Sequence, residues 1–193
     1  MPSLVLASTS RYRRELLARL GLPFEAVSPA CDEEALKDPA LEPRELAQLL
    51  ARAKATSVAF RFPDAYVLGA DQLVEIDGQV LGKPGDAQTA LEQLERLAGK
   101  SHRIITAFAL IAPDGSCEEH LDVHVLHMRA LSAAELGRYV SADSPIDCAG
   151  SYKIESRAMS LFERIEGADF TAIIGLPLIA LTDKLRGHGF EVP

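Results

Sequence analysis

Hydroxyl and guanidinium groups cluster near the start of the chain in a pattern suited to binding phosphate. Ser8 and Ser10 follow a short apolar run at residues 4–7, and Arg13 and Arg14 come soon after. The apolar run predicts a buried strand, and the leucines that follow at helical spacing predict a helix. The N–H groups and the positive dipole end at a helix N-terminus attract anions. The segment therefore predicts a phosphate cradle, although Ser10 as a simple helix cap beside solvated arginines explains the same pattern.

A carboxylate follows the second apolar run that predicts a buried strand, at residues 66–70. Asp71 stands directly after that strand, which is where α/β folds place ligands and reacting groups. A carboxylate in this position can hold a divalent metal or accept a proton from an attacking water. The structural alternative is an Asp that starts a turn and is satisfied by local backbone N–H groups.

A predicted hairpin adds a cation to the same region. Asp77-Gly78 stands between alternating apolar residues and is typical of a two-residue turn. The hairpin folds the chain back, so that Lys83 approaches the strand end that carries Asp71. Lys83 could then neutralise a phosphate bound beside that carboxylate.

The elements that must position these residues alternate between strands and helices, but hairpins interrupt the alternation. This order predicts a mixed α/β sheet flanked by helices. No repeat or linker divides the chain, so residues 1–193 are expected to form a single domain. Strands are expected at 4–7, 24–27, 66–70, 73–76, 79–81, 104–112, 119–128 and 160–165, a polar loop at 28–42, and helices at 14–20, 43–60, 87–98, 133–140 and 177–186.

The composition indicates which kinds of ligand the protein binds and in which cellular compartment it is expected. The formal net charge of −8 argues against a polynucleotide-binding face, but one bound nucleotide needs only a local group of cations. The three cysteines are far apart and form no CxxC pair, which favours a reducing cytoplasm. The sequence contains no pattern of a signal peptide or a membrane-spanning segment. We therefore expect a cytoplasmic protein with a small-molecule substrate and no membrane or polynucleotide partner.

A series of short segments, taken in order, resembles the Maf family of nucleoside triphosphate pyrophosphatases over essentially the whole chain. Each segment is common by itself, and the complete ordered set is highly specific. The segments are Leu6-Ala7-Ser8-Thr9-Ser10 with Arg13-Arg14, Asp32-Glu33, Lys54, Gly69-Ala70-Asp71-Gln72, Gly82-Lys83-Pro84, Ala149-Gly150-Ser151 and Gly175-Leu176-Pro177.

The resemblance implies a fold of two lobes around a deep nucleotide-binding cleft. It implies hydrolysis of a nucleoside triphosphate to the monophosphate and pyrophosphate, aided by a divalent cation such as Mg²⁺ or Mn²⁺, and a homodimer as a candidate assembly. Asp71 would be the catalytic carboxylate, either as proton acceptor or orienting the metal, and Glu33 would help to hold that metal. The triphosphate would be bound by Ser8, Ser10, Arg13, Arg14, Lys54 and Lys83.

The expected base specificity rests on Tyr12, Gln72 and Glu155, which resemble the subgroup that hydrolyses 7-methyl-GTP. Methylation at N7 makes guanine cationic, so an aromatic face at Tyr12 and a carboxylate at Glu155 are suitable neighbours. The alternatives are the same reaction on dTTP, UTP or another non-standard nucleotide, and a non-catalytic nucleotide-binding regulator of cell division. Two residues depart from the usual pattern, since Arg11 replaces a Pro and Tyr12 replaces a Trp.

Overall fold

The computed structural model describes residues 2–38 and 40–192, and the chain divides into two compact units. The first unit consists of Met1–Asp71, Thr106–Asp122 and Asp169–Pro193, apart from residues 1, 39 and 193, and the second consists of Gln72–Ile105 and Val123–Ala168. Three strands of the sheet pass from one unit into the other along the chain.

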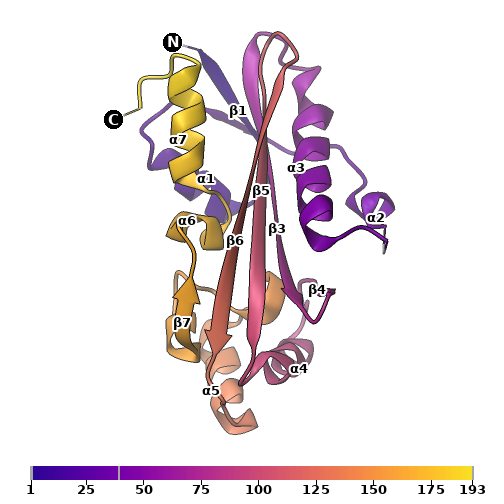
Figure 1. Cartoon of the computed structure of the whole chain (residues 1–193), viewed down its shortest axis with the longest axis vertical. Coiled ribbons are helices and arrows are strands. Elements are labelled where there is room, and N and C mark those ends of the chain that lie inside the picture. Colours follow the sequence, from indigo (N-terminus) through magenta and orange to yellow (C-terminus); the bar gives the residue numbers. More distant parts are fainter. Residues whose placement is uncertain (1, 39, 193) are drawn as a thin grey trace. The chain divides into compact units, whose positions relative to one another are not determined.

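The strands of the described chain form a mixed sheet, as the sequence predicts. Its order is β2-β1-β3-β5-β6-β7, and β4 pairs with β3. The pairs β1–β2 and β1–β3 are parallel, whereas β3–β4 and β6–β7 are antiparallel. The strands are β1 (Ser3–Ala7), β2 (Glu25–Val27), β3 (Ala65–Ile76), β4 (Gln79–Leu81), β5 (Ser101–Ile111), β6 (Cys117–Met128) and β7 (Phe162–Glu166), labelled in Figure 1.

Helices accompany this sheet in both units. Within residues 2–38 and 40–192, none of them combines the length and the apolar character needed to cross a membrane. The α-helices are α1 (Arg11–Ala18), α2 (Glu33–Leu36), α3 (Pro43–Ala59), α4 (Ala87–Leu97), α5 (Ala133–Asp143), α6 (Phe170–Ile174) and α7 (Leu178–Gly187), and short 3₁₀ turns cover Ala149–Ser151 and Ala158–Leu161.

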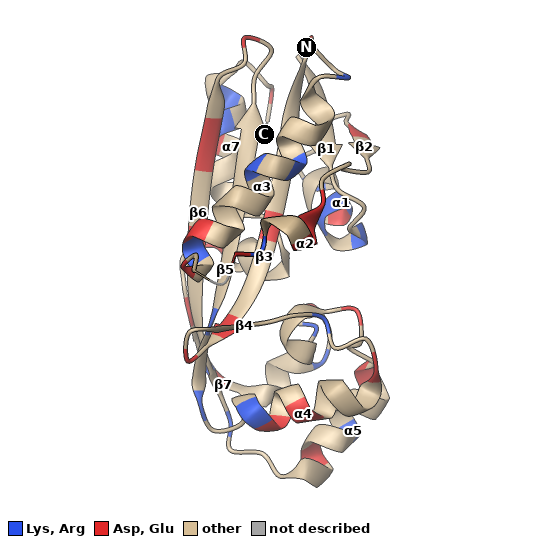
Figure 2. Ribbon diagram, turned by 90° about the vertical axis from the view of Figure 1, so that its right-hand side faces the viewer, with Lys and Arg blue, Asp and Glu red and all other residues tan. Residues whose placement is uncertain are grey.

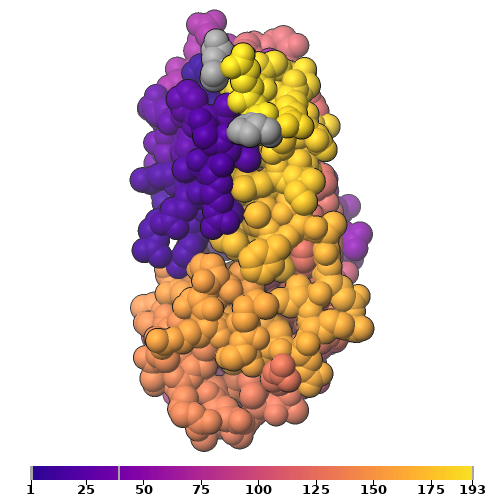
Figure 3. All heavy atoms as spheres, turned by 90° about the vertical axis from the view of Figure 1, so that its left-hand side faces the viewer, coloured from indigo at the N-terminus to yellow at the C-terminus, as the bar shows by residue number. Residues whose placement is uncertain are grey.

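In the first unit, helices cover both faces of the strands. Figure 1 shows α1 and α7 on one side of β1 and β3 and α3 on the other. Side chains alternate between faces along a strand, so Leu4 and Leu6 of β1, with Leu68 and Ala70 of β3, join the apolar core with α1 and α7. The segments at the two ends of the chain therefore pack together, and Figure 3 shows indigo and yellow atoms side by side on one face.

The predicted strand end before Asp71 is wrong. Strand β3 runs without interruption from Ala65 to Ile76, because Leu73 and Val74 beyond the carboxylate are also buried and β4 pairs with the far end of the strand. Asp71 therefore lies inside a long strand. It remains past the end of the pairing with β1, which stops at Gly69.

Two short helices were also not predicted. The segment expected to be a polar loop contains α2, which begins after Asp32, whose carboxylate accepts a hydrogen bond from the N–H of Ala35 at 3.2 Å. The segment before the last helix contains α6. Four- and five-residue helices are too short to show an apolar period.

In the second unit, two elements predicted from short sequence motifs are confirmed. The turn between β3 and β4 has positive φ at both Asp77 (53°) and Gly78 (78°), as a tight two-residue hairpin turn requires. Helix α5 begins with the expected capping box of Ser132 and Glu135. It continues to Asp143, three residues beyond the predicted end at residue 140.

Candidate functional site

A lysine held between two carboxylates is the centre of the candidate site. The Nζ atom of Lys54, on α3, lies 2.6 Å from Oδ1 of Asp71 on β3 and 2.9 Å from Oε2 of Glu33 on α2. Lys54 and Asp71 are buried, and Glu33 is half-buried. Figure 2 shows the acidic helix α2 beside α3. Three residues named from the sequence therefore meet at one point of the first unit.

The close approach of α3 to β3 creates this contact. Side chains at positions 67, 69 and 71 of β3 point to one face, which is the face covered by α3. Gly69 has no side chain there, and a Cβ atom at this position would lie 2.3 Å from the carbonyl oxygen of Ala51 and 2.5 Å from the backbone nitrogen of Ala55. The helix backbone can therefore lie directly on the strand, one turn from Lys54. Gly69 was named as part of a motif, but its packing role is visible only in the structure.

The serines between β1 and α1 form a compact turn in front of the helix N-terminus. The N–H of Ser10 donates to Oγ of Ser8 at 3.1 Å, and Oγ of Ser10 accepts the N–H of Arg13 at 3.4 Å. Ser10 is thus the N-cap of α1, which begins at Arg11, three residues earlier than predicted. The structural interpretation of Ser10 as a cap is confirmed, and its role towards phosphate stays a prediction.

The two arginines of the phosphate prediction occupy different environments. Arg13 is half-buried, and its Nε–H donates to the carbonyl oxygen of Gly175 at 3.0 Å. Desolvation lowers the pKa of the Arg13 guanidinium, while the charges of Asp71 and Glu33 oppose this effect. Arg13 therefore belongs to the same charged group as the carboxylates. Arg14 is exposed at the start of α1.

Of the residues expected to recognise the base, Tyr12 is in the first unit. Its ring is half-buried on α1, and the guanidinium carbon of Arg11 lies 5.1 Å from the ring centroid. Arg11 also forms an i,i+4 ion pair with Glu15 at 3.5 Å. The residue that replaces the usual Pro therefore places a cation on the aromatic face expected to meet a methylated guanine.

Gln72, Lys83 and Glu155 lie in the second unit. Gln72 is half-buried next to Asp71 on β3, and Lys83 is exposed two residues after β4. Glu155 is exposed as well, yet partial desolvation raises the pKa of its carboxyl group, with Asp143 and Asp147 adding to the effect and Lys153 opposing it. The roles of these three residues stay predictions.

The segment that leads to Glu155 is held by side chains of α4 and α5. Gly150 and Ser151 have φ of 72° and 64°, and Ser151 is fully buried, with its Oγ donating to Oε1 of Gln93 at 2.6 Å. The backbone N–H of Lys153 donates to the hydroxyl of Tyr139 at 2.9 Å. A left-handed, non-glycine residue is costly unless its surroundings hold it. The predicted turn at Ala149-Gly150-Ser151 is therefore confirmed, and hydrogen bonds to α4 and α5 hold it in place.

The donor set at Lys54 fits a divalent cation that also binds substrate phosphate. Mg²⁺ is usually bound by one or two carboxylates together with phosphate oxygens and water. Glu33 and Asp71 both contact Nζ of Lys54, so their carboxylates lie near each other, and a metal held by both would have to lie beside this ammonium group. Within the described chain, no group of three or more His, Cys, Asp or Glu side chains is arranged to hold a metal by itself. The role of Glu33 and Asp71 towards a metal stays a prediction.

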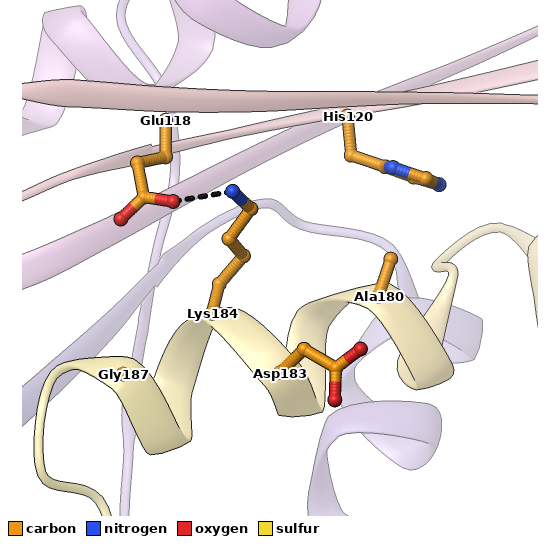
Figure 4. A pocket seen from close by; sticks show the side chains of 6 residues that line it. All are labelled: Glu118, His120, Ala180, Asp183, Lys184 and Gly187. Carbon is orange, nitrogen blue, oxygen red and sulfur yellow. Dashed lines mark ion pairs between the residues drawn. The ribbon is translucent and has the colours of Figure 1, made fainter.

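A separate hollow of about 490 Å³ lies between β6 and α7 of the first unit and shares no residue with the candidate site (Figure 4). Two of its charged residues form an ion pair, since Nζ of Lys184 lies 2.5 Å from Oε2 of Glu118. The remaining lining residues are His120, Ala180, Asp183 and Gly187.

The chain belongs to the Maf-like protein family, whose model matches residues 3–188. It is 48% identical over 193 residues, the full length of both chains, to a protein of Xanthomonas campestris pv. campestris (strain 8004) named 7-methyl-GTP pyrophosphatase. A protein of the same name from Pseudomonas syringae pv. tomato (strain ATCC BAA-871 / DC3000) is 46% identical over 194 residues, again the full length of both.

A solved structure, that of the Staphylococcus aureus Ham1 protein, is similar in fold. The TM-score is 0.56 at 12% identity, covering 96% of this chain and 99% of the other. At this identity the likeness concerns the fold alone. The predicted mixed α/β fold and the predicted family are both confirmed.

Proposed function

We propose that this protein hydrolyses 7-methyl-GTP to the monophosphate and pyrophosphate. The observation that carries the proposal is the buried Lys54 held between Asp71 and Glu33, in the unit that also contains the serine turn and Arg13. The full-length relatives named 7-methyl-GTP pyrophosphatase support the choice of substrate.

The chemistry requires cations and N–H donors for the triphosphate and a carboxylate near the attacking water. We assign the triphosphate to Ser8, Ser10, Arg13, Arg14, Lys54 and Lys83. Water adds to the α-phosphorus, the bond to the bridging oxygen breaks, and pyrophosphate leaves. Asp71 receives the proton of that water or orients the metal, and its Oδ1 is fixed by Lys54 at 2.6 Å.

A divalent cation, when bound, would neutralise charge that develops on the phosphate oxygens. Glu33 and Asp71 are the residues proposed to hold it. For the base, we keep Tyr12, Gln72 and Glu155 as the proposed specificity residues. A cytoplasmic location agrees with three free cysteines in the described chain, and a homodimer stays part of the proposal.

The test is pyrophosphate release with Mg²⁺ or Mn²⁺ from 7-methyl-GTP, GTP, dTTP, UTP and dITP. The matched variants are Asp71→Asn and Asp64→Asn, the latter changing an exposed aspartate before β3. We expect the highest kcat/KM for 7-methyl-GTP, a loss of at least 100-fold in Asp71→Asn, on the scale of losing a proton acceptor, and no loss in Asp64→Asn.

If the enzyme prefers dTTP or UTP, the proposed pyrophosphatase reaction stands, but the proposed specificity for 7-methyl-GTP is wrong. Turnover that survives in Asp71→Asn would reject the assigned carboxylate. Binding of nucleotides without turnover of any of them would favour the regulator that the sequence left open.

A further inference from the structure

The turn between α6 and α7 holds the side chain of Arg13. Gly175 is buried at this turn and has φ of 136°, which favours glycine, and its carbonyl oxygen accepts the Nε–H of Arg13 at 3.0 Å. The N–H groups on the two Nη atoms are those suited to a bidentate contact with phosphate. The position of this one carbonyl oxygen therefore orients the guanidinium plane.

One buried carboxylate fixes both ends of that turn. Asp169 is 4% exposed, and its Oδ1 accepts the N–H and the Oγ1–H of Thr171 at 2.8 and 2.5 Å. Its Oδ2 accepts the N–H of Ile179 in the first turn of α7 at 2.8 Å. Oγ1 of Thr171 also accepts the N–H of Leu178 at 2.9 Å. Asp169 thus caps α6 directly and ties the start of α7 to it.

We propose that Asp169 is a positioning residue for Arg13. It acts through the closed turn and the carbonyl of Gly175, and it sets the orientation in which Arg13 meets the triphosphate. This inference rests on the proposed function for the identity of the anion. All the contacts that carry it lie within the first unit.

Asp169→Asn tests whether Asp169 positions Arg13, because this substitution changes the side chain's shape very little. The amide oxygen of Asn can still accept from Thr171, but its NH₂ group then faces the N–H of Ile179, and two donors cannot bond. We expect KM for 7-methyl-GTP to rise about tenfold, with a smaller change in kcat. The dissociation constant for inorganic pyrophosphate, measured by calorimetry, should weaken by a similar factor. Thr171→Val is the second variant, because it removes the acceptor for Leu178 if Asp169→Asn does not fold.

A double-mutant cycle with Arg13→Ala separates positioning from stability. In the Arg13→Ala background, Asp169→Asn should change KM and pyrophosphate affinity by less than twofold. The matched control is Asp114→Asn, since Oδ1 of Asp114 accepts from the N–H and Oγ–H of Ser116 in the same local pattern, at an exposed turn without a second helix. This control should leave KM unchanged.

Equal losses in both backgrounds would overturn the proposal, and so would unchanged KM and pyrophosphate affinity in Asp169→Asn. Absence of pyrophosphate binding to the unmodified protein would overturn it as well. If the unmodified protein binds pyrophosphate but hydrolyses no nucleotide, the proposed function fails while the cycle, measured on binding alone, still decides the role of Asp169.

Discussion

At the scale of single residues, the candidate site combines two cations with two carboxylates. Lys54 faces two carboxylates, so the trio carries a net negative charge, and Arg13 is the further cation influenced by the same two groups. A divalent metal and a triphosphate would arrive together at such a site, because the carboxylates attract the metal and the arginine and serine turn attract the phosphates. On the proposed function, each ligand would complete the binding site of the other.

Arg11 gives a prediction about the aromatic face of Tyr12. An exposed cation–π contact contributes about 0.5–1 kcal/mol, and a cationic base must displace Arg11 to use the same face. Arg11→Ala should therefore lower KM for 7-methyl-GTP about two- to fivefold and leave KM for GTP nearly unchanged. Arg19→Ala, at the exposed end of the same helix, is the control. An equal change for both nucleotides would contradict a preference of the Tyr12 face for the cationic base.

Glu155 gives a prediction about pH. Its carboxyl pKa is raised by desolvation, and only the ionised form attracts a cationic base. The preference for 7-methyl-GTP over GTP should therefore be full above this raised pKa and should decline as pH falls through it, at a higher pH than for an ordinary glutamate. Glu155→Gln should lower the preference about tenfold at neutral pH, on the scale of a charged hydrogen bond, and remove the decline of the preference in acid. The measurement is the ratio of kcat/KM values from pH 4.5 to 8, with Glu163→Gln as an exposed control.

At the scale of elements, the close packing of α3 against β3 determines whether Lys54 reaches Asp71. Gly69→Ala places a methyl group against backbone atoms of Ala51 and Ala55, which cannot rotate away as a side chain can. We expect a loss of about 1–3 kcal/mol in the free energy of unfolding, as for overpacking, and a fall in kcat of at least tenfold because the lysine moves from the carboxylate.

The matched control for Gly69→Ala is Gly137→Ala. Gly137 lies within α5, and a Cβ atom added there would meet open space, so Gly137→Ala should raise stability by up to about 1 kcal/mol and leave turnover unchanged. Urea unfolding and pyrophosphate release measure both effects. A Gly69→Ala variant with normal kcat would show that the close approach is not needed for catalysis.

The sequence predicted the elements that carry their own local signals. The turn at Asp77-Gly78 and the capping box at Ser132 are decided by neighbouring residues, and both occur as expected. The end of the strand before Asp71 was not predictable in this way. It depends on pairing with β4 and on burial of Val74, which only the folded chain provides.

The candidate site was predictable in part for the same reason. The serine turn follows from hydroxyls between a strand and a helix, but Lys54, Glu33 and the specificity residues came from the family resemblance. The contact between Arg13 and Gly175 joins residues 162 positions apart. No periodicity or short motif reports a pair at that distance, so the role of the last turn emerged only from the structure.

At the scale of the whole molecule, we expect stability in acid to depend on a buried histidine, His102, that has no proposed role in binding phosphate. His102, in the second unit, is 2% exposed, and burial lowers its pKa from 6.5 to about 4. Below pH 6.5 the His102 side chain becomes protonated in the unfolded chain, whereas in the folded chain it stays neutral until about pH 4. This one group therefore removes about 3 kcal/mol of folding free energy as pH falls across that range.

His102→Gln removes the titration while keeping a polar group beside the hydroxyl of Tyr152, which lies 2.8 Å from Nε2 of His102. We expect its unfolding free energy, measured in urea at pH 7, 5.5 and 4.5, to fall less steeply with acid than that of the unmodified protein. Tyr152→Phe is the complementary variant, since it loses the hydrogen bond at every pH but retains the titrating ring and so the steep slope. Identical slopes for His102→Gln and the unmodified protein would assign the acid sensitivity to other groups, because a glutamine cannot take up the proton.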